Sequence, residues 1–101
     1  MIVCVARFKS KMNCLQALKQ SLQELVPLTM GEEGCIAYIL TEEIFYQGSH
    51  GGHWDIALHE KWKDRSSFEH HCQQSYIKNF FDNISPLYVE ESDVRLYETV
   101  H

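Results

Sequence analysis

Residues 59–72, HEKWKDRSSFEHHC, carry histidine, glutamate and cysteine side chains, which are the types that bind metals or transfer protons. If this stretch is a strand running into a helix, Glu60 and Trp62 share one strand face. His70 and His71 then diverge by about 100° on the helix. Helical metal ligands usually stand three or four residues apart. The spacing therefore favours a pocket wall over a metal site, and we expect no metal and no cofactor.

His71 is the candidate general base. Phe68 lies three residues earlier on the same helical side, so His71 should face the interior. A histidine there can accept a proton from a bound ligand near neutral pH. The alternative is a structural histidine whose ring bonds to a backbone carbonyl.

Glu60 is the second candidate catalytic residue. It can accept a hydrogen bond from a substrate hydroxyl, or act as a base if burial raises its pKa. Trp62, on the same face, would form an aromatic wall as well as part of the core. The alternative is a structural ion pair between Glu60 and Arg7 or Arg95 across the sheet.

The elements around these residues follow from hydrophobic periodicity. Strands are expected over residues 2–8, 35–43, 54–62 and 92–100, with Trp54 on the same face as Glu60. Helices are expected over residues 13–27, 64–74 and 75–84, the first with leucines at spacings of three and four.

Capping residues and prolines set the expected helix ends. Asn13 should cap the first helix, and Pro27 should end or kink it. Ser66 and Glu69 fit a capping box for the second helix. The third should be capped by Ser75 and stopped by Pro86.

This order predicts an α+β fold with a ferredoxin-like, four-stranded antiparallel sheet and helices on one face. The strands at residues 2–8 and 35–43 are apolar on both faces. Since helices cover only one face, a second copy of the chain should cover the other, which predicts a homodimer.

The 101 residues indicate a single domain spanning 1–101, and the net charge of -5 argues against a nucleic-acid partner. No stretch approaches the ~20 apolar residues of a membrane span. The four cysteines are dispersed and the opening residues do not resemble a secretory signal, so we expect reduced thiols and a cytoplasmic protein.

The segment ALHEKWKDRSSFEHHCQQSYIKNFF resembles the central signature of antibiotic-biosynthesis-monooxygenase-like (ABM) domains. In that pattern a strand ends in Glu-x-Trp, an acidic turn follows, and a helix carries a histidine nine residues after the tryptophan. Glu60, Trp62, Asp64 and His71 match it. EEGCIAY is similar to the family's Glu-Pro-Gly-Cys turn, with Glu33 replacing the proline, and VARFKSK is similar to its first strand.

The resemblance implies a dimeric α+β barrel with a pocket between sheet and helices in each subunit. Some members oxidise hydroquinones or polyphenols with molecular oxygen and no cofactor, others isomerise a phosphorylated metabolite, and some degrade haem. Tyr76 stands where many members have a second histidine, and would line the pocket with Trp62 and Phe68. Arg7 is a candidate substrate-binding cation.

Departures from the family pattern limit the reaction. Leu58 and Phe68 replace the asparagine and tyrosine of polyketide-oxidising members, and no haem ligand is evident. We expect an enzyme, a cofactor-independent monooxygenase acting on a small aromatic, quinol-like substrate. The alternatives are an isomerase of a phosphorylated metabolite, which would need Arg7 or Arg95, and a non-enzymatic dimeric small-molecule-binding module.

Overall fold

The computed structural model describes residues 1–101 as a four-stranded antiparallel sheet in the order β2-β3-β1-β4, packed against helices. This is the ferredoxin-like α+β arrangement, so the predicted fold class is confirmed. The elements are β1 (Ile2–Ser10), α1 (Leu15–Met30), β2 (Cys35–Glu42), β3 (Ile56–Trp62), α2 (Arg65–Cys72), α3 (Ser75–Asn79), the π-helical turn η1 (Phe80–Ile84), α4 (Ser85–Tyr88) and β4 (Val89–Glu98).

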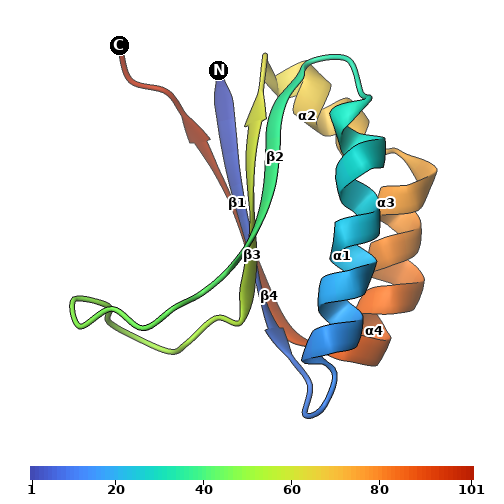
Figure 1. The fold of residues 1–101 in the computed structure, drawn as a ribbon. Helices are drawn as coiled ribbons and strands as arrows, with labels where there is room; N and C mark the ends of the chain where they lie inside the picture. Colours follow the sequence, from blue (N-terminus) through green and yellow to red (C-terminus); the bar gives the residue numbers. More distant parts are fainter.

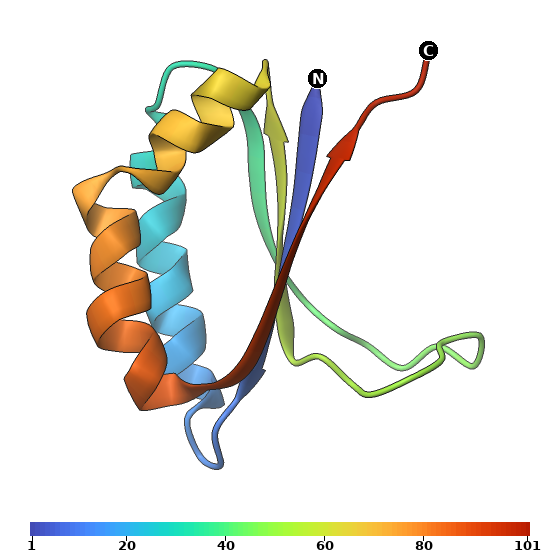
Figure 2. The same ribbon diagram turned by 180° about the vertical axis from the view of Figure 1, so that it is seen from behind.

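All the helices lie on one face of the sheet, and the opposite face is open (Figures 1 and 2). The connection between β2 and β3, residues 43–55, extends as an arm on the side away from the helices (Figure 1). None of the helices is long and apolar enough to cross a membrane.

Alternation along β1 decides which side chains reach the core. Cys4, Ala6 and Phe8 are buried beneath the helices, whereas Val5 and Arg7 point to the open face. Cys4 pairs with Glu60 across β1 and β3, so this carboxyl also enters the helix-covered side.

The first helix differs from its prediction at both ends. Asn13 has φ 64°, a left-handed conformation, and Cys14 occupies the N-cap position instead. The helix continues through Pro27 to Met30. Leu25 and Thr29 are buried on either side of the proline, so packing of this face holds the last turn in place.

The later helices also begin and end differently from the prediction. Asp64 caps α2 by accepting a 2.8 Å bond from the Ser67 amide, while Glu69 pairs with Arg65, so the predicted capping box is wrong. Gln74 rather than Ser75 precedes α3. Pro86 does not stop the helical region, because it sits in the first turn of α4, where a missing amide is tolerated.

Trp54 is the clearest misplacement in the predicted strands. Strand β3 begins at Ile56, and Trp54 lies on the open face, where Arg7 and Lys9 stand 4.7 and 4.9 Å from its ring centre. Two residues beyond the strand, alternation no longer determines the side-chain direction. Strand β4 also starts earlier than expected, at Val89, and ends at Glu98.

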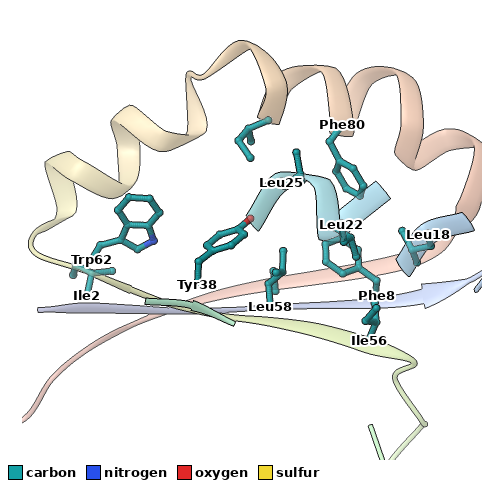
Figure 3. Packing of buried hydrophobic residues seen from close by; sticks show 12 residues of the cluster. Ile2, Phe8, Leu18, Leu22, Leu25, Tyr38, Ile56, Leu58, Trp62 and Phe80 are labelled. Atoms are coloured by element: carbon teal, nitrogen blue, oxygen red, sulfur yellow. The ribbon is translucent and has the colours of Figure 1, made fainter. Parts of the chain in front are cut away.

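The core fills the space between sheet and helices. Figure 3 shows Trp62 and Tyr38 toward one end and Phe8 and Phe80 toward the other, with Leu22, Leu25 and Leu58 between them. At the end that holds Phe8 and Phe80, these two rings are in edge contact, with 5.9 Å between their centres. A candidate site in this layer therefore has a rigid apolar surround.

Candidate functional site

A cavity of about 60 Å³ lies between the sheet and the helices. It is small beside the roughly 300–1,000 Å³ of pockets that hold drug-sized ligands, so its ligand must be small. Its wall is mostly apolar, and the ionisable groups that reach it gather around Glu60 and His71. The lining residues are Cys4, Ala6, Phe8, Leu22, Leu25, Tyr38, Leu58, Glu60, Phe68, His71, Cys72, Ile77, Phe80, Phe81 and Val94.

Helix α2 delivers His71 to this cavity. The residue is 4% exposed, and its ring packs 4.6 Å from the centre of the Trp62 ring and 5.6 Å from that of Tyr38. Phe68 lies one turn earlier and contributes a third aromatic neighbour, at 6.3 Å. The helical spacing that placed Phe68 and His71 together in the sequence therefore does so in the structure.

The two ring nitrogens of His71 face different carboxyl groups. Nδ1 lies 2.9 Å from Oε2 of Glu32, and Nε2 lies 4.0 Å from Oε1 of Glu60. Because a carboxylate only accepts hydrogen bonds, the contact with Glu32 assigns the ring hydrogen of neutral His71 to Nδ1. The lone pair of Nε2 is then directed toward Glu60. Burial lowers the pKa of His71, and Glu32 opposes that shift.

Glu60 is buried without a cation beside it. Its Oε1 accepts a 3.0 Å hydrogen bond from the Trp62 indole. Burial raises the pKa of Glu60 from 4.5 to about 7, with the indole bond acting in the opposite direction. The alternative of an ion pair between Glu60 and Arg7 or Arg95 is wrong, because both arginines bond to Asp93, at 2.8 and 3.1 Å.

The four remaining predicted site residues lie in different places. Phe68 lines the cavity, and Trp62 is fully buried behind His71. Tyr76 is outside the cavity wall, where its single hydroxyl hydrogen is shared between Glu32 and the Leu28 carbonyl. Arg7 points to the open face, so the structure does not bring it to this cavity.

Glu32 and Tyr38 are the neighbours of His71 that sequence reasoning missed. Glu32 sits in the turn between α1 and β2, where no periodic pattern shows the direction of a side chain. Gly34 holds this turn against α2: its φ is 85°, and an added Cβ would lie 2.2 Å from Ser67 Oγ. Tyr38 pairs with Glu60 across β2 and β3, so strand register carried the signal for it.

The thiols near the site are poor nucleophiles. Cys4 and Cys72 line the cavity, and all four cysteines are free. Burial raises the pKa of both cavity thiols, and nearby Glu60 raises it further. Because the thiolate is the reactive form, these cysteines contribute packing rather than covalent chemistry.

The histidines of residues 59–72 point to three different places. His59 lies 2.9 Å from Thr41 on the open face, His70 lies 3.4 Å from Gln74 at the surface, and only His71 enters the cavity. No group of three or more histidine, cysteine, aspartate or glutamate side chains converges in a way that could hold a metal ion.

The four-stranded antiparallel sheet with helices on one face places the chain among ferredoxin-like α+β domains. The family model for antibiotic biosynthesis monooxygenase matches residues 1–83, and the chain belongs to this family. Membership supports a general monooxygenase-like role.

Solved structures agree with this placement. A crystal structure of a Shewanella oneidensis protein is similar at 35% identity and a TM-score of 0.83, over 95% of this chain and 87% of that one. A candidate antibiotic biosynthesis monooxygenase from Deinococcus radiodurans is 19% identical, with a TM-score of 0.85 over 100% and 94% of the two chains.

A dimeric, ferredoxin-like protein of unknown function from Bacteroides fragilis shares the fold, at 14% identity and a TM-score of 0.76, over 97% and 95% of the two chains. Among curated proteins, none is similar enough to this chain to count as a match.

Proposed function

We propose that this protein is a cofactor-independent monooxygenase that oxidises a small, uncharged phenol with molecular oxygen, using His71 as the general base. The observation that carries the proposal is the 4.0 Å separation of His71 Nε2 and Glu60 Oε1. That distance is too long for a direct hydrogen bond, but one hydroxyl oxygen about 2.8 Å from each atom can bond to both.

The two groups then have complementary roles at the substrate hydroxyl. Neutral His71 takes the phenolic proton at Nε2. Protonated Glu60 donates a hydrogen bond to the phenolic oxygen and so stabilises the phenolate anion. The protonated form of Glu60 is accessible because burial raises the pKa of this carboxyl to about 7. The apolar wall excludes water, which strengthens both interactions.

The reaction balances without another reductant. The phenolate transfers an electron to oxygen, and the radical pair combines at a ring carbon. With a benzenediol, one oxygen atom enters the ring to give a hydroxyquinone, and the other leaves as water with two hydrogens from the substrate. The substrate therefore supplies all four electrons that reduce O2.

The absence of a cation in the cavity separates this function from the isomerase alternative. A phosphorylated ligand would need a positive partner for its phosphate group. Arg7 and Arg95 both lie on the other side of the sheet, bonded to Asp93. A binding module that performs no reaction would use the same hydrogen bonds, so activity must be measured to tell these two apart.

Oxygen uptake by metal-stripped protein tests the proposal, on a panel of small phenols and benzenediols with spontaneous oxidation subtracted. We expect uptake that survives chelation and falls in His71→Ala. Anaerobic binding of panel members to a folded protein that shows no uptake above the blank would favour the binding module.

We also propose that a second copy covers the open face of the sheet. Ile39 and Tyr97 lie on that face and are 54% and 51% exposed, and Phe45 on the arm is 90% exposed. Apolar surface of this kind commonly marks an interface. Sedimentation equilibrium should give twice the 11.8 kDa chain mass. A monomer at micromolar concentration would contradict the proposal.

A further inference from the structure

We propose that Glu32 and Tyr76 are positioning residues that set the protonation behaviour of His71: Glu32 holds the ring hydrogen on Nδ1 and stabilises the protonated ring, and Tyr76 moderates this effect. The catalytic meaning of this control rests on the proposed function of His71. The control itself is a property of three side chains and can be measured without a substrate.

The geometry places two donors on one carboxylate oxygen. His71 Nδ1 lies 2.9 Å from Glu32 Oε2, and the two side chains are only 5% and 6% exposed. The Tyr76 hydroxyl donates to the same Oε2 atom. The other oxygen, Oε1, is buried and has no hydrogen-bond partner.

That unequal use of the carboxylate calls for an explanation. A buried carboxylate oxygen without a partner is destabilising, so folding stability alone does not favour this arrangement. The arrangement does, however, leave much of the negative charge of Glu32 uncompensated beside the imidazole ring. A negative charge there stabilises the imidazolium that forms when Nε2 takes a proton, as a carboxylate does beside a histidine general base in hydrolytic triads.

Tyr76 acts on the same oxygen with the opposite effect on His71. Its hydroxyl withdraws electron density from Oε2, which makes Glu32 a weaker acceptor for the Nδ1 hydrogen. Burial and the bond to Glu32 raise the pKa of Tyr76, so it remains a neutral donor across the working pH range.

Other ionisable groups surround His71, but none of them bonds to its Nδ1 atom. Glu60 on β3 faces Nε2 at 4.0 Å rather than Nδ1. The Tyr38 ring on β2 forms a T-shaped contact with the His71 ring, and burial keeps Tyr38 neutral by raising its pKa. The cavity thiols, Cys4 on β1 and Cys72 on α2 itself, are likewise neutral. Glu32 is therefore the group that bonds to Nδ1.

Nuclear magnetic resonance titration of His71 tests the proposal, with nitrogen shifts reporting the tautomer. In the wild type we expect the neutral ring to carry its hydrogen on Nδ1. Glu32→Gln keeps the size of the side chain and removes its charge, so the pKa of His71 should fall by about one pH unit or more. Tyr76→Phe removes the competing donor, so that pKa should rise.

Glu33→Gln is the matched control, because it removes the same charge from an exposed neighbouring glutamate. It should leave the His71 titration unchanged. Equal shifts in Glu32→Gln and Glu33→Gln, shifts of the same sign in Glu32→Gln and Tyr76→Phe, or a neutral wild-type ring with its hydrogen on Nε2 would each overturn the proposal. Tyr76→Phe is conservative, so it gives a result even if Glu32→Gln does not fold.

The failure of this inference is distinguishable from failure of the proposed function. If the His71 titrations of the wild type and the variants follow the predicted pattern but the protein consumes no oxygen, the control by Glu32 is upheld and the monooxygenase function is rejected. Oxygen uptake whose pH dependence is the same in the wild type, Glu32→Gln and Tyr76→Phe would do the reverse. If both proposals are right, the acid limb of the uptake profile should move with the measured pKa of His71.

Discussion

His71 Nε2 and Glu60 Oε1 face each other across 4.0 Å, with both side chains 5% exposed. The two groups arrive from different elements, His71 from α2 and Glu60 from β3, and the Trp62 ring contacts both. Their pKa values are displaced by burial in opposite directions, downward for the histidine and upward for the carboxyl. A neutral base and a protonated acid can therefore coexist near neutral pH, which is the state that the proposed proton transfer needs.

Replacing the proposed base should abolish most of the proposed activity. In His71→Ala we expect kcat/KM for oxygen uptake to fall by roughly 10²–10⁴-fold, the usual contribution of a positioned general base. His70→Ala is the matched control, because its ring is exposed and lies outside the cavity. Equal rates in the two variants would remove His71 from the reaction.

Glu60 should produce an alkaline limb in the pH profile. Above about pH 7 its carboxyl loses the proton that, in the proposed reaction, it donates to the substrate, so wild-type kcat/KM should decline as pH rises through this value. The amide of Glu60→Gln donates at every pH, so the limb should disappear in that variant. A limb that persists unchanged would show that another group causes it.

The same burial has a consequence for stability. From pH 4.5 to about 7, folded Glu60 retains a proton that the unfolded chain has already released. The free energy of unfolding contributed by this group therefore falls as pH rises through that window. Relative to the wild type, Glu60→Gln should gain stability with rising pH, by up to about 3 kcal/mol.

Urea denaturation of both proteins at several pH values would measure this difference, with exposed Glu69→Gln as the control. A difference between Glu60→Gln and the wild type that stays constant with pH would mean that Glu60 titrates normally in the folded protein.

Strand register accounts for much of what the sequence could predict about this site. Once alternation assigned Glu60 and Trp62 to one face, the buried face followed, and helical spacing added Phe68 and His71. The same reasoning failed for Trp54, because strand β3 begins two residues after it.

Glu32 could not be found by periodicity. It lies in a turn, and its direction depends on how Gly34 lets that turn approach Ser67 on α2. Contacts between a turn and a distant helix depend on tertiary packing, which a one-dimensional pattern does not record. The extension of α1 past Pro27 has the same origin, because burial of Thr29 overrides the local preference of proline.

The position of the polar groups predicts which diols bind best. On the cavity face of β3, the side chain two residues before Glu60 is Leu58, about 7 Å away. Ala6 on β1 pairs with Leu58, and Val94 on β4 pairs with Ala6, so this part of the cavity is apolar. A benzenediol with adjacent hydroxyls can direct both toward His71 and Glu60, whereas a 1,4-diol directs one into the apolar region.

Anaerobic calorimetry should therefore show 1,2-benzenediol binding several-fold or more tightly than its 1,4-isomer, since an unpaired buried hydroxyl costs about 1–3 kcal/mol. The two isomers have the same formula and nearly the same size, so each controls for the other. Equal affinities would place the second hydroxyl in water or beside a partner.

The central claim is that the pocket removes a proton from a bound phenol, and absorption spectroscopy of a small chromophoric phenol tests it most directly. Bound without oxygen at a pH below the phenol's own pKa, the dye should show the phenolate spectrum with wild-type protein. With His71→Ala it should bind and stay neutral. A neutral spectrum in the saturated wild-type complex would contradict the account, because the proposed base would then have failed at its defining step.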